Sequence, residues 1–237
     1  MDSQGPARDV AAALVRATAQ ARHKRPEVPS PHFSIALSRE AGSGGFRVAR
    51  EIGKRLNWPV YDHELLEHLA TELHVDVDQL EFVDERPGNF LVDSLKAFSA
   101  VSNVTEVKYF RRLINLIMAL GEHGECVIVG RGAPFILPVA TTLRVRLLAE
   151  GKDRVASVAR ERGLNPTEAA KFVENTDRER IRFIKDHFHK DPSDPQNYDL
   201  VLNCSRFTVD ECAEVIIGAL RHLQARKASV IHGQASS

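Results

Sequence analysis

A glycine-rich turn follows an apolar segment near residue 40. The turn reads Ser38-Arg39-Glu40-Ala41-Gly42-Ser43-Gly44-Gly45. Residues 33–37 before it have the length and apolarity of a strand, and residues 47–56 after it have a helical pattern. Because glycines let backbone N–H groups converge at a helix N-terminus, this layout predicts a cradle for phosphate. The competing interpretation is a tight turn whose glycines serve packing alone.

The turn lacks the usual lysine. A standard phosphate loop reads G-x-x-x-x-G-K-[ST], in which the lysine contacts the terminal phosphates and the hydroxyl helps to hold magnesium. Here Gly45 stands at the candidate lysine position and Phe46 follows it. Arg47 or Arg39 could supply the missing charge, as a planar fork instead of a compact ammonium group. We expect Arg47 to contribute more, because it is nearer to the start of the helix.

Polar residues also follow two other apolar runs. Asp62 lies where a short strand becomes a helix, which fits either a ligand contact or a helix N-cap. Arg131 lies between Gly130 and Gly132, directly after the apolar residues 126–129. An arginine in this setting can grip an anion through two hydrogen bonds. Since no helical surface stripe explains Arg131, we favour a functional role for it.

Residues 176–182 form a further charged group, with three arginines in seven residues. On a helix, Arg178 and Arg182 lie one turn apart on the same face, while Arg180 points elsewhere. Arginines on a moving segment can stabilise the charge of a transferring phosphoryl group and exclude water. The alternative is a solvated helix laced with Glu–Arg pairs, which these residues favour when taken alone.

Alternating strand-like and helical segments must position these groups. Strands are predicted over residues 32–37, 59–61, 126–129, 143–148 and 200–202. Helices are predicted over residues 47–56, 63–73, 104–122, 152–161, 166–185 and 209–224. Most of the strand-like runs are continuously apolar, as expected for strands covered on both faces. The alternation predicts an α/β fold with a parallel, doubly wound sheet and a ligand site beyond the carboxyl ends of its strands.

Composition argues against several classes of function. The 237 residues balance 32 Lys and Arg against 32 Asp and Glu, and no apolar run is long enough to cross a bilayer. This balance argues against a general nucleic-acid or membrane-surface role. The 3 cysteines have no CxxC spacing, and the histidines are scattered, so we expect reduced thiols and no protein-built metal site. We expect a cytoplasmic protein, since no secretory segment is recognisable.

Together these segments resemble the cytidylate kinase-like family, a branch of the P-loop nucleoside monophosphate kinases. The resemblance rests on residues 38–45, 58–66, 126–132, 175–180 and 197–205, in register along the chain. It implies a P-loop NTPase-type three-layer fold with a five-stranded parallel sheet, a helical acceptor-binding insertion and a lid. It also implies transfer of the γ-phosphoryl group of ATP to a nucleoside monophosphate, with Mg²⁺ as charge bridge and CMP or dCMP as default acceptor.

The resemblance also assigns site residues by position. Donor-binding residues would be Arg39, Gly42, Ser43, Gly44, Gly45 and Arg154. Acceptor-binding residues would be Asp62, Arg131, Asp177 and Arg180. Catalytic arginines would be Arg47, Arg131, Arg178 and Arg182. Two departures stand out: cytidylate kinases carry a lysine where this chain has Gly45, and a base-selecting aspartate where it has Gly132.

The composition sets residues 1–30 apart as an extension, because an alanine-rich stretch is followed by basic residues and prolines. It is either a helix that can join two copies into a homo-oligomer or a frayed tail. Residues 31–226 would be the main domain and residues 227–237 a tail. Within the main domain, residues 74–123 would form the acceptor-binding insertion or a plain helical cover, and residues 163–195 the lid. Two other functions stay open, a catalytically weak nucleotide sensor and a kinase of another small metabolite. The expected partners are nucleotides, with no nucleic acid and no membrane.

Overall fold

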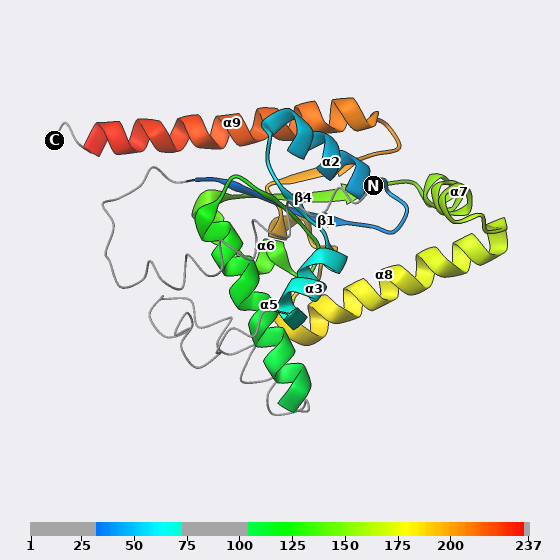
Figure 1. Ribbon diagram of the computed structural model, residues 1–237. Helices are drawn as coiled ribbons and strands as arrows, with labels where there is room; N and C mark the ends of the chain where they lie inside the picture. Colours follow the sequence, from blue (N-terminus) through cyan, green and yellow to red (C-terminus); the bar gives the residue numbers. More distant parts are fainter. Residues whose placement is uncertain (1–31, 73–103, 235–237) are drawn as a thin grey trace.

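A parallel five-stranded sheet forms the centre of the protein, whose computed structural model describes residues 32–72 and 104–234 (Figure 1). The strands are β1 (Ser34–Arg39), β2 (Val60–Tyr61), β3 (Val127–Val129), β4 (Thr142–Leu148) and β5 (Leu200–Asn203). Their order across the sheet is β2-β3-β1-β4-β5, so β1 is central. Each strand lies within two residues of its predicted bounds, and the predicted fold class is confirmed.

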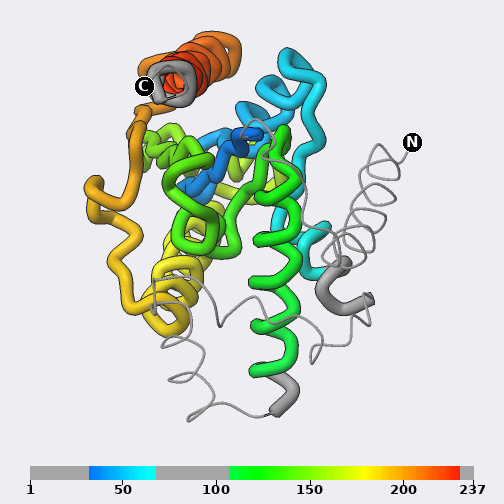
Figure 2. Tube along the Cα trace, turned by 90° about the vertical axis from the view of Figure 1, so that its left-hand side faces the viewer, coloured from blue at the N-terminus to red at the C-terminus, as the bar shows by residue number. Residues whose placement is uncertain are grey.

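Helices cover both faces of the sheet (Figure 1). The helices are α2 (Gly45–Leu56), α3 (His63–Glu72), α5 (Val104–His123), α6 (Ala133–Ile136), α7 (Gly151–Arg162), α8 (Pro166–Phe188) and α9 (Val209–Gln234), with short 3-10 turns η2 (Val139–Thr141) and η3 (Pro195–Asn197). Helices α2 and α9 pack on one face, and α5 and α6 on the other. Helix α9, seen almost end-on in Figure 2, lies on the opposite side of the sheet from α8.

The sheet separates two hydrophobic cores, because side chains alternate along each strand. Ile35 and Leu37 of β1 pack with α2 and α9, whereas Ala36 between them packs with α5. Ser38 continues the side of Ala36 and is paired in register with Arg146 of β4. The alternation therefore directs Ser38 and Arg146 toward the α5 side, at the carboxyl ends of β1 and β4.

A local signal explains where the long helix α8 begins. Helix α8 begins with a capping box, in which the Asn165 side chain accepts from the Glu168 N–H at 2.9 Å and Pro166 takes the first turn. Helix α9 continues to Gln234, past its predicted end at residue 224 and into the predicted tail.

The predicted extension and most of the predicted insertion lie outside the described residues, and α5 is the described part of that insertion.

Candidate functional site

The glycine-rich turn joins β1 to α2 and offers free N–H groups. Gly42 and Gly44 have φ angles of 75° and 77°, a left-handed conformation that glycine adopts without strain. The N–H groups of Gly42, Gly44 and Gly45 form no hydrogen bond within the described part of the chain. The Ser43 hydroxyl folds back and donates to the carbonyl of Glu40 at 2.9 Å. Unpaired N–H groups at the N-terminus of a long helix can bind an anion.

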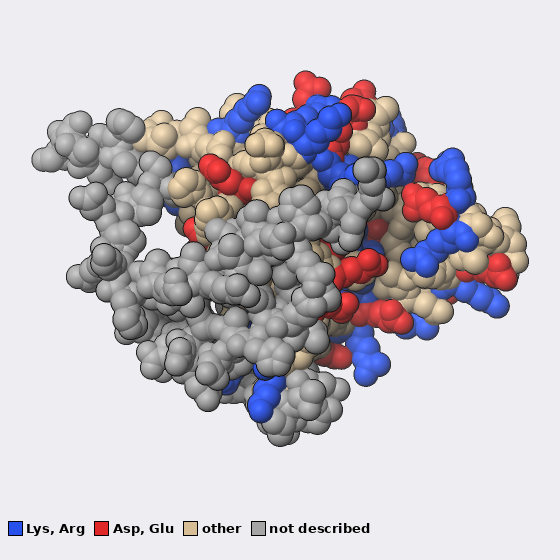
Figure 3. All heavy atoms as spheres, viewed as in Figure 1, with Lys and Arg blue, Asp and Glu red and all other residues tan. Residues whose placement is uncertain are grey.

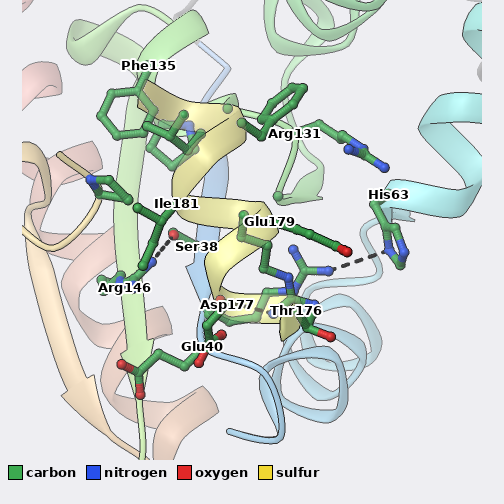
Figure 4. Close-up of a pocket in the computed structure, with 18 residues that line it drawn as sticks. Ser38, Glu40, His63, Arg131, Phe135, Arg146, Thr176, Asp177, Glu179 and Ile181 are labelled. Carbon is green, nitrogen blue, oxygen red and sulfur yellow. Dashed lines mark hydrogen bonds between the residues drawn. The ribbon is translucent and has the colours of Figure 1, made fainter. Parts of the chain in front are cut away.

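A cavity of about 280 Å³ opens beside this turn, at the carboxyl ends of β1, β3 and β4 (Figure 4). Four arginines from separate segments line it: Arg39 at the end of β1, Arg131 after β3, Arg146 on β4 and Arg180 on α8. Apolar side chains provide much of the remaining wall, namely Pro134, Phe135, Ile181, Phe183, Ile184 and Pro192. The glycines of the turn are not among the lining residues, so Arg39 and Glu40 form the boundary between turn and cavity.

Three of these arginines have no carboxylate partner among the described residues. Arg146 donates to the Ser38 hydroxyl at 2.7 Å, and its Nε is buried without a hydrogen bond. Arg180 donates to the backbone carbonyl of Arg39 at 3.2 Å. The Arg39 guanidinium lies 3.5 Å from Nδ1 of His63, as the dashed line in Figure 4 marks. Acidic residues lie near them, since Asp62 and Asp177 act on the charges of Arg39 and Arg180, but in the described chain none is directly paired with these guanidinium groups. Positive charges held out of water without a directly paired carboxylate favour a bound anion.

The pKa values of the cavity residues reflect first their burial and then the charges of neighbouring arginines. Burial, together with the charges of Arg180 and Arg131, lowers the pKa of Arg39 to about 9. Burial also lowers the pKa of Arg180, and Arg146 and Arg131 lower it further, while Asp177 opposes the shift. Burial and the charges of Arg39 and Arg131 lower the pKa of His63, which favours its neutral form at pH 7. A bound anion would reverse each of these charge effects.

Arg131 lies in the cavity, where the sequence places an anion clamp. It has a φ angle of 48°, and its guanidinium pairs with Glu67 and lies 5.3 Å from the centre of the Phe183 ring. A Cβ atom at Gly132 would overlap the ring of Phe188. The position that carries an aspartate in cytidylate kinases is therefore closed to any side chain here.

Asp177 and Arg154 connect the glycine-rich turn to α7 and α8. The Asp177 carboxylate accepts from the Ala41 N–H at 2.7 Å and pairs with Arg154. Arg154 also donates to the Ala41 carbonyl at 3.3 Å. Asp177 lines the cavity as well, so the two helices are attached to both the turn and the cavity wall.

Two predicted site residues, Asp62 and Arg47, lie outside the cavity. Asp62 is buried, and its carboxylate accepts from the Leu65 N–H at 2.9 Å, which is the N-cap role. The Arg47 side chain is 57% exposed and lies 3.9 Å from Glu161. Its guanidinium lies over the glycine turn: a Cβ atom placed on Gly44 would be 3.1 Å from Nη2 of Arg47. A ligand role for either residue stays a prediction.

Arg178 and Arg182 also point away from the cavity. They pair within α8 with Glu174 and Asp186, at 2.6 Å and 3.2 Å, and their side chains are 67% and 81% exposed. Acidic and basic side chains lie side by side over the end of the molecule that carries α7 and α8 (Figure 3). The structure brings Arg180 into the cavity but leaves these two on the surface, and their catalytic role stays a prediction.

The sequence reasoning missed Arg146 and His63. Arg146 lies in the run 142–148, where its charge interrupts a strand expected to be covered on both faces. A charge at such a position signals a function, because a buried charge needs a partner. His63 begins α3 directly after Asp62 and has no comparable signal.

Comparisons with known proteins agree with this geometry. The model of the cytidylate kinase-like family matches residues 34–206. The chain belongs to this family. The cytidylate kinase of Methanopyrus kandleri is 29% identical over 203 residues, which cover 81% of this chain and 95% of that protein. An uncharacterized protein from Eubacterium ventriosum ATCC 27560 has a similar structure, with a TM-score of 0.66 and 27% identity over 81% of this chain and 99% of that one.

The described residues contain neither a candidate membrane span nor a cluster of candidate metal ligands. None of the helices in residues 32–72 and 104–234 combines the length and apolarity that a membrane span requires. Within the same residues, no three His, Cys, Asp or Glu side chains are grouped as metal ligands.

Proposed function

We propose that this protein transfers the γ-phosphoryl group of ATP to a nucleoside monophosphate, with CMP and dCMP as the first acceptors to test. The observation that carries the proposal is the meeting of a free N–H cradle with three arginines that lack carboxylate partners in the described structure. Phosphoryl transfer concentrates negative charge where two phosphates meet, so its catalyst must supply positive charge there. Membership of the family and the similarity to a cytidylate kinase support a nucleotide as acceptor.

Each group has a role in this proposal. The turn at residues 42–45 holds the donor phosphates, Arg146 and Arg180 surround the transferring group, and Arg131 grips the acceptor phosphate. The acceptor phosphate is itself the nucleophile, so no serine or histidine needs activation, and catalysis consists of alignment and electrostatics. Residues 163–195, which include α8, form the lid, and the region of α5 forms the acceptor side.

The proposed donor is ATP in complex with Mg²⁺. Mg²⁺ is commonly held by one or two carboxylates together with substrate phosphates, and it neutralises charge between those phosphates. Glu40 is the candidate to test, because it is the lining residue next to the glycine turn that carries a carboxylate. Without a ligand, that carboxylate accepts from the Ala149 N–H at 3.2 Å and lies 3.5 Å from Nε of Arg154, so it would have to exchange these contacts to hold the metal. A cytoplasmic location and a homo-oligomer through residues 1–30 remain parts of the same proposal.

A coupled assay of ADP release tests the function. Mg-ATP is offered with CMP, dCMP, UMP, AMP and GMP in turn, and we expect ADP release that depends on at least one of them. Arg160→Ala serves as the control, because Arg160 is an exposed residue of α7. ATP binding without ADP release on any acceptor would contradict a kinase and favour the nucleotide sensor.

A kinase of another phosphorylated metabolite is the second candidate, and one contact favours it. Phe188 fills the space beside Gly132, so the base-selecting acid of cytidylate kinases has no counterpart at that position. The same assay with sugar phosphates and other phosphorylated metabolites separates the two functions. ADP release on a metabolite and on no nucleotide would select the second.

A further inference from the structure

We propose that Arg39 replaces the missing phosphate-loop lysine and binds the phosphates between which the phosphoryl group moves. This inference rests on the proposed function and identifies the residue that makes it workable. The first observation concerns Gly45, which stands at the lysine position. A Cβ atom there would lie 2.8 Å from Cβ and 3.0 Å from Cγ of Arg39. The stem of Arg39 therefore occupies the space in which the stem of a lysine at position 45 would begin.

A second glycine makes room for the other end of the same side chain. A Cβ atom at Gly130, after β3, would overlap Nη1 of Arg39. The Arg39 side chain thus runs from the glycine turn, past Gly45, to the end of the neighbouring strand. Glycine is required at both ends of this path, although positions 45 and 130 are far apart in the sequence. The path of Arg39 is therefore open because neither position carries a side chain.

The Arg39 guanidinium is also available for a ligand. It lines the cavity, and its one polar contact among the described residues is the 3.5 Å approach to His63. Arg180 and Arg131 lie near enough to repel it, so an anion between them would relieve the repulsion. Arg47, the other candidate, lies over the glycine turn beside Gly44, but its side chain is 57% exposed and does not line the cavity. Position in the cavity therefore favours Arg39 over Arg47.

The proposed step involves no change in Arg39 itself. An oxygen of the acceptor phosphate forms a bond to the γ-phosphorus of ATP, and the bond from that phosphorus to the β,γ-bridging oxygen breaks. ADP leaves with the electron pair of the broken bond. Arg39 stays protonated and balances the negative charge on the transferring oxygens and the bridging oxygen, as the lysine does in a standard loop.

A transplantation experiment on the full chain tests this assignment. Arg39→Ala is expected to lower kcat by about 100-fold to 1,000-fold, the usual cost of removing one preorganised donor. The double variant Arg39→Ala/Gly45→Lys restores a lysine at the standard position and removes the side chain that would collide with it. We expect it to recover at least about tenfold of the lost kcat. Gly45→Lys alone should lower activity or yield, because Arg39 still fills the space.

Several outcomes would overturn the assignment. The assignment is wrong if the kcat of Arg39→Ala stays within about threefold of the wild-type value. It is also wrong if Arg47→Ala loses more kcat than Arg39→Ala. A double variant that melts like the wild type and yet stays as inactive as Arg39→Ala would also refute the exchange. Arg160→Ala is the matched control for loss of an arginine, and thermal unfolding shows that each variant is folded.

A binding measurement separates this inference from the proposed function. If the wild type transfers phosphate to no acceptor, the proposed function fails, and calorimetry with the β,γ-imido analogue of ATP and with AMP still tests Arg39. We expect Arg39→Ala to lower the affinity for the analogue by at least about tenfold and to change the affinity for AMP by no more than about twofold. Equal affinities of wild type and Arg39→Ala for the analogue would overturn the inference alone.

Discussion

The two sides of α8 use the same residue type in opposite ways. Arg178 and Arg182 extend into solvent and pair with carboxylates one turn away on their own helix. Arg180 points into the cavity, where it donates to a backbone carbonyl and lies near other arginines. Within the described chain it forms no ion pair, although the charge of Asp177 partly offsets its own. A surface ion pair contributes little, whereas an uncompensated buried charge destabilises the empty protein. The arginine that looks worse for stability is therefore the stronger candidate for function.

The largest expected effect comes from breaking this difference within α8. Arg180→Ala should lower kcat/KM for ATP-dependent transfer by about 100-fold or more, because it removes a charge from the reacting phosphates. The loss of kcat/KM in Arg178→Ala and in Arg182→Ala should be at least about tenfold smaller than in Arg180→Ala. The charges of these two arginines already face water and a carboxylate. Steady-state kinetics of the three variants provide the measurement. Equal losses in all three would restore the lid role that the sequence predicts for the outer pair.

The second prediction concerns the stability cost of the buried charge of Arg39. Arg39→Met should raise the free energy of unfolding of the ligand-free protein by about 1–4 kcal/mol, because an apolar side chain replaces a poorly compensated charge. The folded pKa of Arg39 is about 9, below its ordinary value, so its proton is held less tightly in the folded state. The gain is therefore full below pH 9 and shrinks as the pH rises above it. Urea unfolding at pH 7 and pH 10 measures the gain, and a less stable variant at pH 7 would contradict the argument.

Asp62 offers a smaller and contrasting test. Asp62→Ala should lower the free energy of unfolding by about 1 kcal/mol, because the N-cap of α3 is lost. The same substitution should have little effect on the KM for the acceptor, because the carboxylate already accepts a hydrogen bond from the Leu65 N–H. Chemical unfolding and acceptor titration on the same sample compare the two effects. A raised KM with unchanged stability would return Asp62 to the acceptor site.

The smallest effect concerns His63. Its pKa is lowered in the folded protein, so the unfolded chain takes up a proton more readily, and folding stability should fall as the pH drops below about 6.5. The loss should stay under about 1 kcal/mol because the imidazole is partly in water. His63→Asn should remove this component. Unfolding in buffers free of phosphate at pH 7.5 and pH 5.5 measures it, and an unchanged pH slope in the variant would assign the loss to other groups.

The elements of the fold were predictable, but the pairing of side chains was not. The strands are short apolar runs separated by helical patterns, and both signals are local. Arg146 was overlooked because its strand was treated as one apolar run, although Arg144 and Arg146 alternate with Leu143 and Val145. The preference for Arg47 over Arg39 followed distance along the chain. The path of Arg39 depends instead on a glycine at position 130, which only the folded sheet brings near it.

The contact between Gly132 and Phe188 restricts how this protein can change. Phe188 ends α8, and its ring lies 5.8 Å from that of Phe135 and 5.7 Å from that of Phe110. An acid at position 132 would displace this ring and loosen the helix that carries Arg180. Gly132 lines the cavity and can carry a side chain only if the ring of Phe188 moves. A change in the shape or charge of this wall of the cavity is therefore easier to make at its other lining residues.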